Sequence, residues 1–196
     1  LKEVLLTIQN KDAGMIVTTF SSHIARLKSI VEFGKKLNRE VVFLGRSLDK
    51  YSTAAKNAGI APFLNDIRIS KYRKQVEKMF AKVERNRKKY LVVCTGHQGE
   101  PGSILERLSR KELPFKLNPN DNLVFSSSVI PTEVNKEQFA KMETRLKKSK
   151  PRIFRDAHVS GHPAREDLRD ILSIVKPRHI LPSHGGLDKT APMGDL

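Results

Sequence analysis

Four of the six histidines of this 196-residue chain lie in one segment, RDAHVSGHPAREDLRDILSIVKPRHILPSHGG. His158 and His162 frame the turn HVSGH, His184 lies in the turn PSHGG, and residues 165–175 between the turns have the apolar spacing of a helix. Near neutral pH an imidazole can ligate a metal, contact a phosphate or transfer a proton, and scaffolds usually present such groups on loops. The segment therefore predicts a chemical role for the three histidines. The alternative is that they are ordinary polar loop residues.

Short apolar runs alternate with amphipathic segments along most of the chain. Strands are predicted at 15–20, 40–45, 89–96, 122–128 and 178–186, and helices at 23–37, 48–59, 68–89, 102–113, 135–150 and 165–175. This alternation predicts an α/β fold in which a mostly parallel sheet carries helices on both faces. The charged, proline-containing stretch KKSKPR (147–152) is the expected boundary between a first domain, 1–150, and a second, 151–196.

Small polar residues follow the predicted strands, in TTFSSH, LGRS, CTGHQGEPG, SSSVIP, AHVSGH and PSHGG. In parallel sheets ligands bind beyond the carboxyl ends of the strands. Hydroxyl groups and free backbone N–H groups beside helix N-termini form anion sites there. Gly96, Gly99 and Gly102 would let the chain approach a phosphate closely. The strand ends therefore predict an anion-binding edge.

The chain is strongly basic, with 37 Lys and Arg against 21 Asp and Glu and a formal net charge of +16. Half of this excess lies in RISKYRKQVEKMFAKVERNRKKY (68–90), where ten basic residues face only Glu77 and Glu84. Such a surplus favours polyanions, because neutralising a phosphate backbone releases its counterions. We therefore expect a nucleic-acid partner. A solubilising helix face is the alternative.

Cys94 is the only cysteine and lies inside the apolar run LVVCTG. A single cysteine excludes an internal disulfide and a multi-cysteine metal site, and it fits a reducing compartment such as the cytoplasm. No run of about 18 apolar residues occurs, so we expect no membrane partner.

Four stretches resemble, in order along the chain, the β-CASP group of metallo-β-lactamase-fold nucleases. They are IVTTFSSHIARLKSIVEFGKKLNREVVFLGRSL, LVVCTGHQGEPGSILERLS, DNLVFSSSVIP and AHVSGHPAREDL…KPRHILPSHGG. Within that group the likeness is to ribonucleases J of the archaeal type. It implies a β-CASP domain over 1–150. It also implies that 151–196 is a returning, incomplete segment of the metallo-β-lactamase domain into which the β-CASP domain is inserted.

The resemblance also implies roles for individual residues. His162 matches the motif B histidine, which binds the scissile phosphate and is implicated in protonating the leaving oxygen, so it is the expected catalytic residue. His184 matches the motif C histidine, a ligand to one of two zinc ions, with manganese as an alternative metal. A histidine at motif C favours RNA over DNA. The expected RNA-phosphate contacts are His158, Val159, Ser160, Gly161, His162, Ser21, Ser22, Arg46, Ser47, Gly96, Gln98, Gly99 and Glu100. Relatives are oligomers, so a homo-oligomer, a dimer by resemblance, is expected.

The chain departs from the family pattern because the signature His-x-His-x-Asp-His and the motif A acid are absent from it. We therefore expect a portion of a longer enzyme that binds RNA weakly and is inert by itself. For the complete enzyme we expect 5′-to-3′ exonuclease action on 5′-monophosphorylated RNA. The alternatives are an RNA-processing endonuclease and a non-catalytic, basic RNA-binding domain. A doubly wound nucleotide-binding domain is disfavoured, because neither G-x-G-x-x-G after the first strand nor a P-loop is present.

Overall fold

A six-stranded sheet forms the centre of this protein. The computed structural model describes residues 5, 8, 10–155, 165–181, 186–191 and 194, and the chain divides into two compact units, 1–158 and 159–196. The strands are β1 (Met15–Thr18), β2 (Glu40–Leu44), β3 (Arg68–Ser70), β4 (Tyr90–Cys94), β5 (Asn122–Phe125) and β6 (Arg152–Phe154). Their order is β3-β2-β4-β1-β5-β6, and all five pairings are parallel. The predicted α/β fold with a parallel sheet is confirmed.

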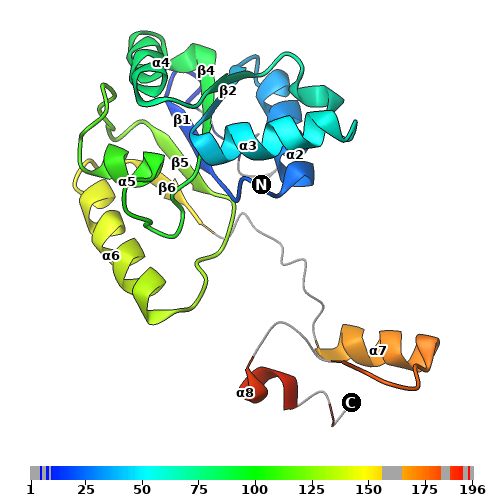
Figure 1. The fold of residues 1–196 in the computed structure, drawn as a ribbon. Helices are drawn as coiled ribbons and strands as arrows, with labels where there is room; N and C mark the ends of the chain where they lie inside the picture. Colours follow the sequence, from blue (N-terminus) through cyan, green and yellow to red (C-terminus); the bar gives the residue numbers. More distant parts are fainter. Residues whose placement is uncertain are drawn as a thin grey trace. The chain divides into compact units, whose positions relative to one another are not determined.

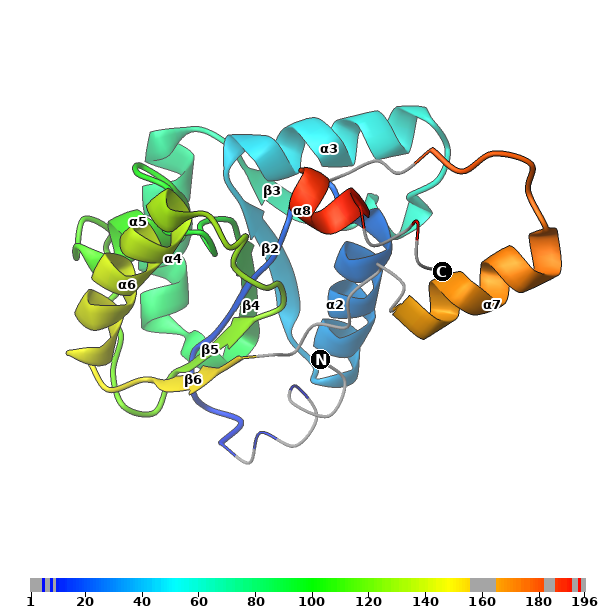
Figure 2. The same ribbon diagram turned by 90° about the horizontal axis from the view of Figure 1, so that it is seen from below.

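Helices cover both faces of the sheet (Figures 1 and 2). The first face carries α2 (Ile24–Lys36) and α3 (Arg46–Asn57), and the second carries α4 (Arg73–Arg85), α5 (Ile104–Ser109) and α6 (Glu133–Lys147). Short 3-10 turns lie at Pro62–Leu64 and Arg87–Lys89. The helices that connect β1 to β2 and β2 to β3 thus lie on one face. Those that connect β3, β4, β5 and β6 lie on the other.

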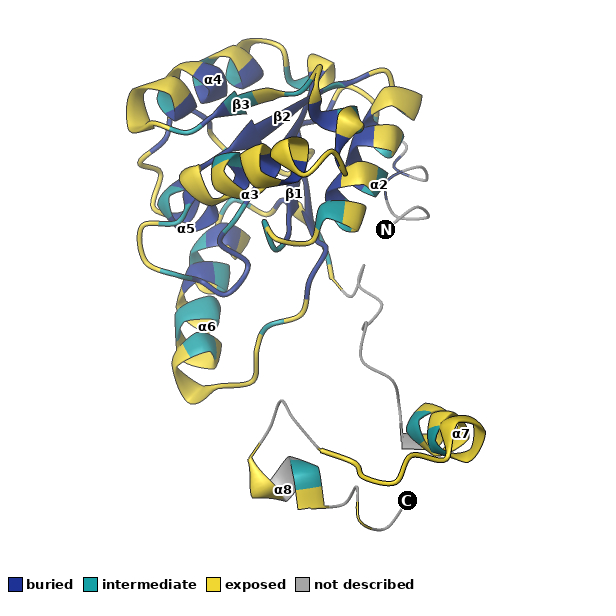
Figure 3. Ribbon diagram, turned by 45° about the vertical axis from the view of Figure 1, so that its right-hand side comes forward, coloured by how far each residue is buried: buried dark blue, intermediate teal, exposed yellow. Residues whose placement is uncertain are grey.

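The four inner strands, β2, β4, β1 and β5, are largely buried because helices cover them on both sides (Figure 3). Every residue of β1, β4 and β5 is buried, which explains why these strands have near-continuous apolar sequences. Alternate side chains enter the two cores. Ile16 and Val92 pack under α4, α5 and α6, whereas Val17 and Val93 pack under α2 and α3. In the part of the chain that the structure describes, no helix is long and apolar enough to cross a bilayer.

Two predictions from the sequence require correction. The basic segment is not one helix, because it opens with β3, and α4 begins only at Arg73. The sequence 178–181 was predicted to start a strand, but these described residues form none. The rest of that predicted strand, 182–185, lies outside the described residues.

The second unit contains α7 (Arg165–Val175) and α8 (Leu187–Thr190). Helix α7 confirms the helix predicted from apolar spacing. Two of the apolar residues that give this spacing, Ile171 and Val175, are exposed in this structure. Strand β6 pairs with β5 in the first unit, so the sheet continues past residue 150. The division of the chain at 150 and 151 stays a prediction.

Two buried charged side chains bind the chain together at the amino ends of the strands. The carboxylate of Asp121 is fully buried and accepts hydrogen bonds from the backbone N–H groups of Gly14 and Asn118 and from the Arg87 guanidinium. Arg39, only 6% exposed, donates to four backbone carbonyls, those of Lys11, Ala13, Arg87 and Tyr90. Buried charges are tolerated when they are paired and hydrogen-bonded in this way.

Replacing Asp121 with alanine should destabilise the fold strongly. The substitution leaves the Arg87 guanidinium without its buried partner and two backbone donors without an acceptor. Breaking a buried ion pair in this manner costs about 3–5 kcal/mol. Urea denaturation followed by circular dichroism measures the loss. The exposed Asp66 serves as control, and Asp66→Ala should change the free energy of unfolding by less than about 0.5 kcal/mol. Equal effects of the two substitutions would contradict the role assigned to Asp121.

Candidate nucleic-acid interface

A cavity of about 620 Å³ opens at the carboxyl edge of the sheet, where β1, β2, β3 and β4 end. The neighbouring strands β1 and β4 are followed by α2 and α5, which pack on opposite faces of the sheet. This is the arrangement that creates ligand sites in parallel sheets. The cavity is lined by the segments that follow these four strands, including the starts of α3, α4 and α5: Phe20, Ser21, Gly45, Arg46, Ser47, Lys71, Tyr72, Arg73, Val76, Thr95, His97, Glu100, Pro101, Gly102, Ser103, Ile104 and Arg107.

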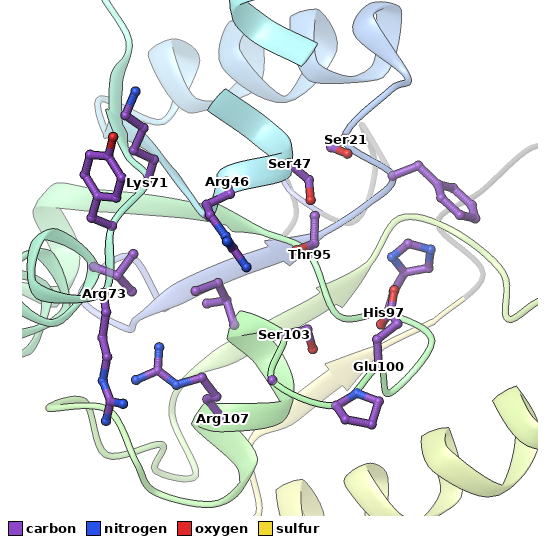
Figure 4. Close-up of a pocket in the computed structure, with 17 residues that line it drawn as sticks. Ser21, Arg46, Ser47, Lys71, Arg73, Thr95, His97, Glu100, Ser103 and Arg107 are labelled. Carbon is purple, nitrogen blue, oxygen red and sulfur yellow. The ribbon is translucent and has the colours of Figure 1, made fainter. Parts of the chain in front are cut away.

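Four cations line this cavity against one carboxylate, that of Glu100. Arg46 and Arg107 come from opposite sides, from α3 and α5 (Figure 4). The remaining two, Lys71 and Arg73, lie on the segment that joins β3 to α4. A cavity with this excess of positive charge favours an anionic ligand.

Acidic residues hold three of these cations in place. The Glu77 carboxylate accepts from Arg73 at 2.9 Å and from Arg107 at 3.2 Å, and Lys71 lies 3.4 Å from an Asp49 oxygen. The hydrogen bonds from Arg73 are the leading cause that lowers the pKa of Glu77, and the bond to Asp49 raises the pKa of Lys71.

The Arg46 side chain is exposed, and within the described part of the chain no ion pair is found for it. It begins α3 directly after Gly45, which provides no side-chain cap. The first backbone N–H groups of a helix have no partner within the helix, and they favour anions there. Ser47 adds a hydroxyl at the same place. The start of α3 thus combines a guanidinium, a hydroxyl and helix N–H groups.

His97 is the most unusual side chain of the cavity wall. The residue is only 2% exposed, and neither ring nitrogen has a hydrogen-bond partner among the described residues. Its ring packs edge-on against Phe20, with 4.1 Å between the ring centroids. Burial lowers the pKa of His97 to about 4, so the imidazole is neutral at pH 7. A neutral imidazole offers one N–H donor and one acceptor to a ligand.

The loop between β4 and α5 is held from outside the cavity. The Gln98 amide donates to the carbonyl of Ser128 at 3.1 Å and accepts from the N–H of Ile130 at 2.8 Å. Gly99 has φ +79°, and a Cβ there would lie 2.5 Å from the backbone of Gln138 in α6. These residues position the loop and do not line the cavity. The same holds for Gly96, where a Cβ would lie 2.5 Å from the Ser103 hydroxyl.

The predicted site residues therefore fall into three groups. Ser21, Arg46, Ser47 and Glu100 line the cavity, as expected for residues that follow strands. Ser22 is exposed and does not line it, and Gly96, Gln98 and Gly99 act on the loop. The third group, which lies outside the described residues, comprises His158, Val159, Ser160, Gly161, His162 and His184.

Several lining residues were missed by the sequence analysis. Lys71 and Arg73 follow β3, which the helical pattern of the basic segment concealed. Arg107 lies one turn into α5, and only its spacing of four residues from Ser103 places it at the strand end. His97 follows β4 and also lines the cavity, where it is 2% exposed.

Among the residues that the structure describes, no group of three or more His, Cys, Asp or Glu could hold a metal ion. The predicted zinc ligand His184 is not one of these residues. Cys94 is buried at the end of β4, and burial raises the pKa of its thiol to about 12, so it is a core residue.

Two family models match the chain. The model "Ribonuclease J, beta-CASP domain" matches residues 12–144, and "Zn-dependent metallo-hydrolase RNA specificity domain" matches residues 149–193. Together these two matches cover most of the chain.

Three curated relatives illustrate the likeness. A ribonuclease J of Methanocaldococcus jannaschii is 44% identical over 192 residues, covering 97% of this chain and 43% of the relative. One of Pyrococcus abyssi is 41% identical over 172 residues, which is 88% of this chain and 38% of the relative. One of Sinorhizobium meliloti is 33% identical over 178 residues, which is 86% of this chain and 29% of the relative. The chain thus spans less than half the length of these relatives.

The burial of His97 predicts a specific loss of stability in acid. Because its folded pKa of about 4 lies below the ordinary value of 6.5, the unfolded chain binds more protons between these pH values. The stability that His97 contributes is therefore complete above about pH 6.5 and is lost as the pH falls toward 4. Between pH 7 and pH 4.5 this loss amounts to about 2 kcal/mol.

Urea denaturation of His97→Phe at the two pH values measures this effect. The substitution removes the titrating group and keeps a ring beside Phe20. The free energy of unfolding should fall less between pH 7 and pH 4.5 in this variant than in the unmodified chain. His179→Phe, which replaces an exposed histidine, should behave like the unmodified chain. An unchanged pH dependence in His97→Phe would show that His97 is not held neutral by the fold.

Proposed function

This chain belongs to the ribonuclease J family, and from that premise we propose that it is the RNA-binding part of a metal-dependent ribonuclease. The observation that carries the proposal is the cationic cavity at the carboxyl edge of the sheet. In this proposal RNA phosphates bind there, between the start of α3 and Arg107. The net charge of +16 supports a polyanionic substrate.

The chemistry of the cavity suits a phosphodiester. A phosphate oxygen accepts charge-assisted hydrogen bonds from a guanidinium such as Arg46, and it also accepts from hydroxyl groups such as those of Ser21 and Ser47. The buried, neutral His97 forms part of the cavity wall beside these donors. Such contacts position the backbone and carry no information on base sequence. We therefore propose binding without strong base preference.

For cleavage we propose the roles that the sequence suggests for two histidines. His184 is proposed as a zinc ligand, and His162 as the residue that contacts the scissile phosphate and protonates the leaving oxygen. Zinc, two ions in the complete enzyme with manganese as the alternative, would supply an activated water and would stabilise charge on the phosphate. We further propose 5′-to-3′ exonuclease action on 5′-monophosphorylated RNA, a homodimer and a cytoplasmic location.

Removing the free guanidinium should weaken RNA binding by this chain. Arg46→Gln deletes a charge-assisted contact to phosphate, which corresponds to about a tenfold rise in Kd. Fluorescence anisotropy with a labelled single-stranded RNA at a fixed salt concentration measures the Kd. Arg68→Gln is the matched control, because Arg68 lies on β3 beside Glu40, which begins β2 at the amino edge of the sheet. A control that weakens binding as much as Arg46→Gln would mean that only net charge matters.

The proposed catalytic roles are tested on the full gene product. We expect His162→Ala and His184→Ala each to abolish cleavage of a 5′-monophosphorylated, 3′-labelled RNA in the presence of zinc or manganese, while RNA binding is largely retained. The 196-residue chain by itself should bind RNA without cutting it. Release of mononucleotides supports exonuclease action, whereas internal fragments identify an endonuclease. Unchanged cleavage in both variants would contradict the proposed roles, and a full product that binds RNA without cleaving it would favour a non-catalytic domain.

A further inference from the structure

A line of four cations runs along the outer side of α4. It consists of Lys74, Lys78, Lys82 and Arg85, called here the α4 stripe. Their spacing of four, four and three residues places them above one another on a single helix face. All four are exposed, whereas Val76, Met79, Phe80 and Val83 of the same helix are buried in the core (Figure 3). The stripe therefore faces solvent.

The charge of the α4 stripe is not compensated by its own helix. The helix has two acidic residues, and both have other partners. Glu77 accepts from Arg73 and Arg107, and Glu84 accepts from Arg87 at 2.6 Å and from the backbone N–H of Lys116 at 2.9 Å. Within the described residues, no ion pair involves a member of the stripe. Four like charges at this spacing repel one another, and an anionic ligand would relieve that repulsion.

The stripe begins where the cavity ends. Lys71, Tyr72 and Arg73 line the cavity and lead directly into α4, which then runs back toward the amino edge of the sheet over 13 residues. At 1.5 Å per residue this is a track of roughly 20 Å. A chain with a repeating negative charge that leaves the cavity past Tyr72 would meet the stripe.

An exposed aromatic ring lies between the two. Tyr72 is 58% exposed, lines the cavity and directly precedes α4, and the Lys71 ammonium lies 5.1 Å from its ring centroid. Exposed aromatic rings beside cations are the surfaces on which unpaired bases stack. A ring at this place distinguishes a single-stranded nucleic acid from a polyanion without bases.

We propose that Tyr72 and the α4 stripe form a second RNA-binding surface that holds single-stranded RNA where it leaves the cavity. In this arrangement Tyr72 stacks on a base, and the stripe contacts successive phosphates. The inference rests on the proposed RNA binding at the cavity. It adds a dependence on RNA length, because only a strand longer than the cavity reaches the stripe.

The test compares single-stranded RNAs of about four and about fifteen nucleotides, which fall within the range of single-strand site sizes. The stripe variant carries Lys74→Gln, Lys78→Gln, Lys82→Gln and Arg85→Gln, and glutamine preserves helix propensity. The control variant carries Lys35→Gln, Lys36→Gln, Lys50→Gln and Lys56→Gln. These exposed lysines of α2 and α3 give the same change in charge on the other face of the sheet. Circular dichroism checks that both variants are folded.

We expect the stripe variant to bind the long RNA at least about tenfold more weakly, and its slope of log K against log salt to fall by about 3. Binding of the short RNA should stay within about twofold, and the control variant should bind both RNAs nearly as the unmodified chain does. Equal losses in the two variants, or no loss in either, would overturn the inference. If the unmodified chain binds neither the short nor the long RNA, the proposed function itself is wrong.

Tyr72→Leu separates RNA from other polyanions. Loss of one stacked base should weaken the long RNA about tenfold and leave inorganic polyphosphate, which has no bases, unchanged. Tyr51→Leu is the control, since Tyr51 is 42% exposed on α3. An equal loss for RNA and polyphosphate, or no loss for RNA, would overturn the role of Tyr72.

Discussion

The parallel direction of the strands determines where this protein can bind a ligand. In the register of the sheet, Cys94 of β4 pairs with both Thr18 of β1 and Leu44 of β2, and Thr18 pairs with Phe125 of β5. Four strands therefore end at the same level, and the segments that follow them start side by side. Arginines, serines and a histidine that are far apart in the sequence meet at this edge because of that alignment.

The charged side chains at the two edges of the sheet differ in burial and in hydrogen bonding. At the amino edge Asp121 and Arg39 are buried, and their hydrogen bonds go to backbone groups and to Arg87. Such pairing fixes the ends of β1, β4 and β5, because an unsatisfied buried charge would be far more costly. At the carboxyl edge, by contrast, the ring nitrogens of His97 have no hydrogen-bond partner among the described residues, and Arg46 remains exposed. The paired groups of the amino edge hold the fold together, whereas Arg46 stays available to a ligand.

The sequence predicted what depends on local pattern and missed what depends on distant contacts. Buried strands are apolar on both faces, so β1, β2, β4 and β5 were found, and Ser21, Arg46, Ser47 and Glu100 were found as residues that follow them. Strand β3 has only three residues within a basic run, so Lys71 and Arg73 were hidden. Gln98 could not be recognised as a loop clamp, because its partners lie 30 and 32 residues further along the chain.

Three of the four cavity cations are paired with carboxylates, and Arg46 is the exception. Glu77 pairs with Arg73 and Arg107, Glu112 lies 3.5 Å from Arg107, and Asp49 lies 3.4 Å from Lys71. These exposed or partly exposed pairs contribute little to stability and serve to orient the side chains, whereas the exposed Arg46 keeps its full charge and favours an anion. His97 adds no positive charge to this wall, because burial lowers its pKa to about 4 and keeps the imidazole neutral at pH 7. The positive potential of the cavity therefore comes from its lysine and arginine side chains, and Arg46 is the one among them that remains open to a ligand in the described part of the chain.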